Sequence, residues 1–219
     1  MAMNNQKYVF LKALIVTIVV FNLGIYMGYK LESSRLDKIN DWYSDAEMKL
    51  LDQRIQKDAF DLIDLDCEAV LEENIAFADS IFEDALKIAE YEKANKLGEG
   101  IVKLHERYDL LRTLFWMNSM RIKSKCGLDY FNVVYFYDYY NPTLEQESKQ
   151  NFFSNLLEEL KKEHGAGIML IPISGDSESS SIKLLVEKYG ISELPAILID
   201  EQFIVTNPKT REDIEQYLK

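Results

Sequence analysis

The chain has 219 residues, a formal net charge of −12 and a pI of about 4.7. That length leaves room for one or two domains, and the negative charge argues against nucleic acid as a partner, because phosphate groups repel an acidic surface. There are only two cysteines, Cys67 and Cys126, and two widely separated histidines, His105 and His164. We therefore predict no disulfide scaffold, no metal site and no cofactor, and we expect both histidines at surface or half-buried positions.

An apolar segment, residues 8–29, comes first. Lys12 is its only charged residue, and residues 13–29 are uncharged, close to the minimum of about 17 residues that cross the apolar core of a bilayer. The Lys12 side chain can extend toward the membrane surface, which lengthens the span. A cleaved signal peptide is the alternative, but it has a shorter apolar core and a cleavage site of small residues, which residues 27–30 lack. We predict a single-pass membrane protein whose residues 1–30 form a short tail and an uncleaved signal anchor.

The flanks of this segment do not decide its orientation, because positive residues stand on both sides of it. Gly24 and Gly28 are spaced so that a second membrane helix can approach closely. This spacing allows a homodimer or pairing with a partner helix, but the motif is short, and we favour the alternative below. Glycine is common in membrane helices, so the alternative is that neither glycine takes part in pairing.

Residues 31–126 are predicted to form a helical domain. Residues 31–125 contain no proline, only two glycines (Gly98 and Gly100) and many strong helix formers, which favours long helices. Apolar residues recur at steps of three and four on both sides of the glycines, which indicates two amphipathic helices joined by a tight turn. Gly98 is the candidate C-terminal cap of the first helix. An earlier helix, about residues 33–60, is expected to continue from the membrane segment and to pack on this hairpin.

The first helix of the hairpin is strongly acidic. Its carboxylates are Asp64, Asp66, Glu68, Glu72, Glu73, Asp79, Glu83 and Asp84. Carboxylates on helices build metal sites together with Glu-x-x-His motifs from neighbouring helices. No such motif occurs in the sequence, so we predict a solvated acidic face.

The two cysteines lie at comparable distances before and after the predicted turn. Because an α-helix rises about 1.5 Å per residue, Cys67 and Cys126 are expected to meet near the open end of the hairpin. A disulfide there would close a loop of about 60 residues and would require an oxidising compartment. The alternative is a pair of unrelated buried thiols. With the bond, we expect the soluble part of the protein outside the cytoplasm.

Residues 127–219 alternate between strand and helix patterns, so the fold class is α+β or α/β. Short β-branched and aromatic runs predict strands, and longer amphipathic runs predict helices. Strands are expected at residues 131–137, 167–173, 194–200 and 203–206, with a two-residue turn at Glu201-Gln202, and helices at residues 144–162, 180–189 and 210–218.

This order of strands and helices resembles the thioredoxin fold. Tyr189-Gly190-Ile191 precedes Leu194-Pro195-Ala196 at the spacing where that superfamily has a Tyr-Gly-Ile/Val segment and then its cis-proline. Pro142 matches the proline of the family's Cys-Gly-Pro-Cys motif. The resemblance covers residues 127–219 only, and it implies a thioredoxin-like domain with Pro195 beside the loop that follows the first strand.

The two cysteines of the family's motif are missing. Tyr140 and Thr143 stand in their places, and neither side chain provides the thiolate that attacks a disulfide. In the family, the surface beside the cis-proline holds extended peptides, so the resemblance implies a platform for a protein or peptide partner. Its predicted residues are Tyr137, Tyr139, Tyr140, Asn141, Pro142, Thr143, Leu194 and Pro195. Tyrosines suit an interface; the alternative is that they only cover the N-terminus of the next helix.

These observations favour a non-enzymatic function, that of a membrane-anchored, redox-inactive thioredoxin-like protein that binds or scaffolds a protein or peptide. The alternative is a thiol–disulfide oxidoreductase or redox sensor that uses Cys67 and Cys126 as a non-standard pair. Lys123 and Lys125 stand near Cys126 and favour a thiolate, whereas acidic neighbours of Cys67 raise its pKa. This distribution of charge favours a structural bond over a catalytic one.

Overall fold

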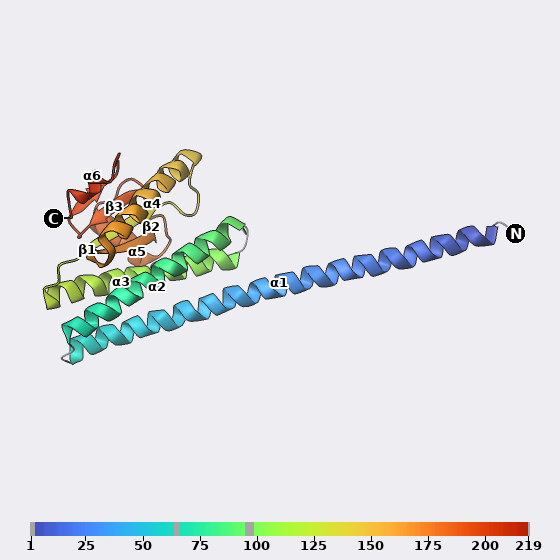
Figure 1. Ribbon diagram of the computed structural model, residues 1–219, viewed down its shortest axis with the longest axis horizontal. Coiled ribbons are helices and arrows are strands. Elements are labelled where there is room, and N and C mark those ends of the chain that lie inside the picture. The colour runs from blue at the N-terminus through green and yellow to red at the C-terminus, as the bar shows by residue number, and fades with distance from the viewer. Residues whose placement is uncertain (1–2, 64–65, 95–98, 219) are drawn as a thin grey trace. The chain divides into compact units, whose positions relative to one another are not determined.

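The computed structural model describes residues 3–63, 66–94 and 99–218, and the contacts within it divide the chain into two units, Met1–Ser44 and Asp45–Lys219. Helix α1, Met3–Leu62, runs through the first unit and into the second (Figure 1). The predicted domain boundaries after residues 30 and 126 stay predictions.

The first unit consists of the first part of α1. The side chains of residues 8–29 are exposed and mostly apolar. By length and composition, α1 is long and apolar enough to cross a membrane. A Cβ atom added at Gly24 or at Gly28 would have no neighbour within 4 Å in the described chain, apart from the nearby backbone of α1 itself. Pairing through these glycines therefore stays a prediction.

Helices form one layer of the second unit. The last part of α1 packs against α2, Cys67–Ala94, and α3, Glu99–Cys126. The side-chain amide of Asn118 on α3 donates to the backbone oxygen and to Oε1 of Gln53 on α1, at 3.2 and 3.0 Å. α2 and α3 pack against each other, and the start of α2 is linked to the end of α3 through Cys67 and Cys126, which fits the predicted hairpin; the long helix before it packs on α3. The predicted cap Gly98 lies outside the described residues.

A mixed sheet of four strands forms the centre of the second unit. The strands are β1 Phe131–Tyr137, β2 Ile168–Ser174, β3 Ala196–Ile199 and β4 Phe203–Val205, in the order β2-β1-β3-β4. β1 pairs in parallel with β2 and antiparallel with β3, and β3 pairs antiparallel with β4. β1 is an inner strand, and residues 132–136 are buried. Pro172 lies in β2, at one edge of the sheet.

The two faces of this sheet are covered by different helices. The remaining helices are α4 Leu144–His164, the short 3-10 helix η1 Gly165–Gly167, α5 Ser180–Lys188 and α6 Glu212–Glu215. Alternate residues of a strand point to opposite faces. Val134 and Phe136 of β1 pack with α2, α3 and α5 on one face. Val133 and Tyr135 pack with α4 and α6 on the other, so β1 lies between two helical layers.

The hairpin turn between β3 and β4 differs from the prediction. It centres on Asp200 and Glu201, which both have positive φ, 49° and 59°, instead of on Glu201 and Gln202. The Gln202 N–H donates to the Ile199 oxygen at 3.0 Å and closes the turn. Positive φ at both central residues matches the right-handed twist of the paired strands.

The last helix is shorter than predicted. The sequence indicated residues 210–218, whereas α6 spans Glu212–Glu215. The Asp213 carboxylate accepts the N–H groups of Lys209 and Thr210, at 2.8 and 3.0 Å. This local bonding holds the preceding residues in a turn, which competes with extension of the helix toward the N-terminus.

Candidate functional site

The loop after β1 emerges where the predicted cis-proline lies. Phe136 pairs with Ala196 in antiparallel register, so Pro195 lies opposite Tyr137 at the point where β1 ends. The peptide bond between Leu194 and Pro195 is cis, and Pro195 is buried. The fold therefore brings together the two segments that the sequence assigned to one surface.

The Asp176 carboxylate fixes the backbone of this loop. Its Oδ1 accepts the N–H of Tyr139 at 3.0 Å, and its Oδ2 accepts the N–H of Tyr140 at 2.8 Å. From α4, the side chain of Gln150 accepts the N–H of Asp138 at 2.7 Å. Burial, and then the nearby Asp176 charge, raise the pKa of the Asp138 carboxyl. The loop is thus held by carboxylate and amide groups.

Thr143 stands where the resemblance would place a second cysteine, and it caps helix α4. Its Oγ1 accepts the N–H of Gln146 at 3.2 Å, and Gln146 Oε1 accepts the N–H of Thr143 at 2.8 Å. This reciprocal pair is a capping box, which gives partners to two N–H groups that the start of a helix otherwise leaves unbonded. Thr143 therefore stabilises the helix that follows the loop.

Removing this cap is expected to have a measurable cost. Thr143→Ala should lower the free energy of unfolding by about 1 kcal/mol, because the Gln146 N–H loses its acceptor. Thr143→Ser keeps the hydroxyl and should have little effect. Urea unfolding of the full chain, followed by circular dichroism, measures both variants. If serine destabilised the protein as much as alanine, packing of the threonine methyl group would be responsible and the cap would not.

The side chains of Tyr137 and Tyr139 reach a buried histidine on α3. His105 Nε2 lies 2.8 Å from the Tyr137 hydroxyl, and its Nδ1 lies 2.9 Å from Glu92 Oε1. The Tyr139 hydroxyl donates to the same Glu92 oxygen at 2.9 Å, and its ring stacks on the imidazole, with centroids 3.5 Å apart. His105 is only 6% exposed, so the prediction of a surface or half-buried position was wrong.

Both phenols keep their protons. Burial raises the pKa of Tyr137 and of Tyr139, and the carboxylates of Glu92 and Asp109 add to the effect. The Tyr137 hydroxyl forms a hydrogen bond with His105 Nε2, and His105 Nδ1 forms one with Glu92. One chain of hydrogen bonds thus joins α2, α3 and the end of β1.

A second group of buried polar side chains adjoins the histidine. Asp109 accepts from Arg112 Nη1 at 3.1 Å and from the Ser174 hydroxyl at 2.6 Å, and its Oδ2 lies 3.5 Å from His105 Nε2. Asp109 is fully buried, and Arg112 is 3% exposed. Because Ser174 ends β2 and the two charged residues lie on α3, this group ties the hairpin to the sheet. The sequence prediction missed all of these residues.

A cavity of about 270 Å³ lies beside these groups, between α2, α3, α4 and the strands β1 and β2. Most of the surface that lines it is contributed by apolar atoms. Polar and ionisable groups are contributed by Glu92, His105, Arg112, Tyr135, Tyr137, Tyr139, Gln150, Ser154 and Glu158. Two residues of the predicted platform, Tyr137 and Tyr139, are half-buried and line this cavity.

Other residues of the predicted platform are accessible. Asn141 and Thr143 are exposed, and Tyr140, Pro142 and Leu194 are half-buried. Leu194 packs over Gly175, where a Cβ atom would come within 2.7 Å of Leu194 Cδ2. The absence of a side chain at Gly175 therefore allows Leu194 to pack at this position. Tyr140, Asn141, Pro142 and Leu194 are referred to below as the loop surface.

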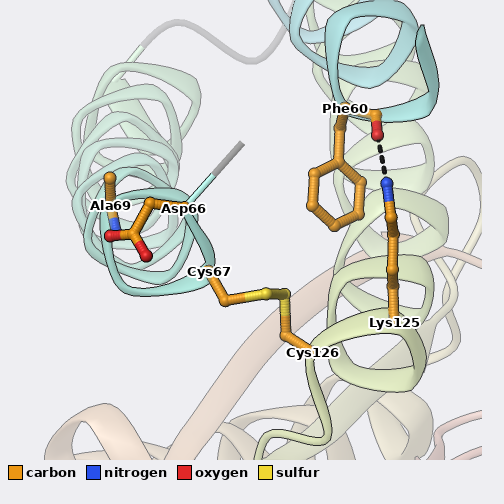
Figure 2. Close-up of a disulfide and its surroundings, with 6 residues drawn as sticks. All are labelled: Phe60, Asp66, Cys67, Ala69, Lys125 and Cys126. Carbon is orange, nitrogen blue, oxygen red and sulfur yellow. Dashed lines mark hydrogen bonds between the residues drawn. A yellow bond between two sulfur atoms is a disulfide. The ribbon is translucent and has the colours of Figure 1, made fainter. Parts of the chain in front are cut away.

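Cys67 and Cys126 are held together at the open end of the hairpin. Their sulfur atoms are 1.97 Å apart, the separation of a disulfide bond (Figure 2), which fits the predicted pairing. Cys67 begins α2 and Cys126 ends α3. Beside them, the Lys125 ammonium donates to the backbone oxygen of Phe60 at the end of α1 (Figure 2).

The cysteine pair is remote from the loop. Cys126 precedes β1 and the loop follows it, and a strand of seven residues spans about 20 Å. The two sulfur atoms therefore cannot act together with the loop surface on one substrate atom. Thiol exchange at this pair alone, the alternative function from the sequence, stays a prediction.

Within residues 3–63, 66–94 and 99–218, the structure contains no group of three His, Cys, Asp or Glu side chains that could hold a metal ion. Comparison with protein-family models gives no match to this chain, and comparison with curated proteins gives none either.

Proposed function

We propose that this protein is a single-pass, membrane-anchored, redox-inactive protein with a thioredoxin-like domain, and that its loop surface binds a protein or peptide partner. One observation carries the proposal. The loop after β1 lies beside the cis Leu194–Pro195 bond, yet Tyr140 and Thr143 occupy the positions where dithiol chemistry needs cysteines. A loop with this geometry and without thiols can hold a partner, but it cannot exchange disulfides with it.

The sheet supports the thioredoxin-like part of the proposal. β1 and β2 are parallel neighbours connected through α4, and β3 and β4 form an antiparallel hairpin on the other side of β1, followed by α6. This is the arrangement implied by the resemblance in the sequence. A cis-proline immediately before β3 fits the same resemblance.

Two features support the membrane anchor and the compartment. Residues 8–29 of α1 expose apolar side chains, and α1 is long enough to cross a bilayer. The Cys67 and Cys126 sulfur atoms lie at disulfide distance, and structural disulfides persist in oxidising compartments. We therefore propose that the soluble part of the protein is outside the cytoplasm.

The loop surface has properties that favour binding. Tyr140 supplies an amphipathic ring that loses little rotamer entropy on association. Its backbone is already fixed by Asp176, and its ring meets the Tyr139 ring edge-on, with centroids 5.2 Å apart. A surface ordered before binding has a smaller entropic cost to overcome when a partner arrives.

Photo-crosslinking in the native membrane tests the proposed partner surface. The photoreactive residue p-benzoylphenylalanine replaces the exposed Asn141 in the full chain, and in a control variant it replaces the exposed Asn155 on α4. We expect a discrete crosslinked band from position 141 that is absent from position 155. Adding Tyr140→Ala should reduce the yield of this band several-fold. The same bands from both positions, or no band from position 141, would overturn the proposal.

A further inference from the structure

The cavity beside β2 has an aromatic and acidic wall that the loop surface does not use. Phe82, Tyr135, Tyr137 and Tyr139 contribute rings to its lining, and Glu92 contributes a carboxylate. Its volume of about 270 Å³ is near the lower end for pockets that hold small molecules. The size and the lining therefore point to a small ligand that has both apolar and polar parts.

Glu92 places a carboxylate in this wall. Its Oε1 accepts one hydrogen bond from the Tyr139 hydroxyl and one from His105 Nδ1, each at 2.9 Å. These two hydrogen bonds hold the carboxylate in place in the wall. The Glu92 side chain is only 19% exposed, and a partly desolvated charge attracts an opposite charge more strongly than one in water does.

The other charged residues of the lining are balanced by neighbours. The Arg112 guanidinium donates to Asp109 at 3.1 Å, so this buried pair adds little net charge. Glu158 on α4 accepts from Lys162 at 2.8 Å on the protein surface. Among the described residues of the lining, Glu92 is therefore the carboxylate that has no Lys or Arg partner.

We propose that this cavity binds a small organic cation, of the alkylammonium or quaternary ammonium class. Aromatic rings attract cations electrostatically, and the Glu92 carboxylate adds a direct attraction of opposite charges. Apolar residues of the lining such as Ala85 and Leu170 suit the methyl and methylene groups of such a ligand. An anion would be repelled by Glu92, and a neutral molecule would gain nothing from its charge. The site goes beyond the proposed partner surface and does not depend on it.

Choline and its uncharged isostere 3,3-dimethylbutan-1-ol test the proposal, because they share a shape and differ in charge. Each is titrated by ligand-observed NMR into the full chain in dodecyl maltoside micelles, which contain no ammonium group. We expect choline to bind at least about tenfold more tightly than the alcohol. Equal affinities, or no binding of choline at millimolar concentration, would overturn the proposal.

A matched pair of variants locates the charge. Glu92→Gln keeps the size of the side chain and an acceptor oxygen, and it should weaken choline binding about tenfold. Glu90→Gln makes the same change at an exposed position of the same helix and should leave the affinity within about twofold. Equal losses in both variants would show general attraction to an acidic protein and would overturn the proposal. Circular dichroism checks the fold of Glu92→Gln; if this variant does not fold, the two probes on the native chain decide the question.

Discussion

Arg112→Met is expected to lower the free energy of unfolding by about 3–5 kcal/mol. Arg112 is the cationic partner of Asp109, at 3.1 Å, and Asp109 is fully buried. Methionine is of similar length but uncharged, so the carboxylate would lose its counter-charge where water does not reach it. The Ser174 hydroxyl would still donate to Asp109, which favours the lower end of the expected range.

Urea unfolding of the full chain in detergent micelles, followed by circular dichroism, measures this effect. Arg121→Met is the matched control on the same helix. Arg121 lies 3.6 Å from Asp61, and both side chains are more than one-third exposed, so its loss should cost less than about 1 kcal/mol. Arg112→Met combined with Asp109→Asn should recover much of the stability, because neither buried charge remains. Equal effects of the two single Arg→Met variants would contradict the prediction.

Opening the link between Cys67 and Cys126 is the second change with a large expected effect. Cys126→Ser should lower the free energy of unfolding by about 4 kcal/mol in the chain-entropy description. The two cysteines are 59 residues apart, so the bond removes much of the conformational freedom of the unfolded chain. Cys67 is the first residue of α2, and Cys126 is the last residue of α3. The ends of both helices should therefore lose protection first.

Denaturation with and without dithiothreitol measures this loss, and hydrogen exchange locates it. The native chain should become less stable in reductant by about the same amount as the Cys126→Ser variant. Cys67→Ser with Cys126→Ser should match the single variant, because either change opens the same loop, and reductant should not affect the double variant further. A native chain whose stability is indifferent to reductant would contradict the prediction.

The strands and the cysteine pair could be predicted because their signals are local or geometrically simple. Phe131–Tyr137 is rich in β-branched and aromatic residues, and β1 spans these same residues. Pairing Cys67 with Cys126 needs only the rise of a helix and the position of a turn. The start of the last helix was harder to predict. The Asp213 carboxylate accepts hydrogen bonds from the N–H groups of Lys209 and Thr210, and the amino-acid composition of this segment does not indicate these bonds.

The buried polar groups could not be predicted in this way. His105 forms hydrogen bonds with Glu92 and Tyr137, which lie 13 and 32 residues away in the sequence. No local sequence pattern indicates contacts between residues so far apart. One signal exists in the sequence. His105, Asp109 and Arg112 follow one another at steps of four and three, which places them on one face of α3. A polar stripe at this spacing normally faces water, whereas this one is buried against the rest of the second unit.

Pro172 limits how this protein can associate with other chains. Edge strands present unpaired backbone groups that invite pairing with strands of other molecules, including misfolded copies. In the sheet that the structure describes, β2 has a residue without an N–H at its edge, and β4 at the opposite edge is only three residues long. Growth of the sheet by added strands is therefore disfavoured on both sides. This favours recognition through side chains, which can be selective, over backbone pairing, which accepts many sequences.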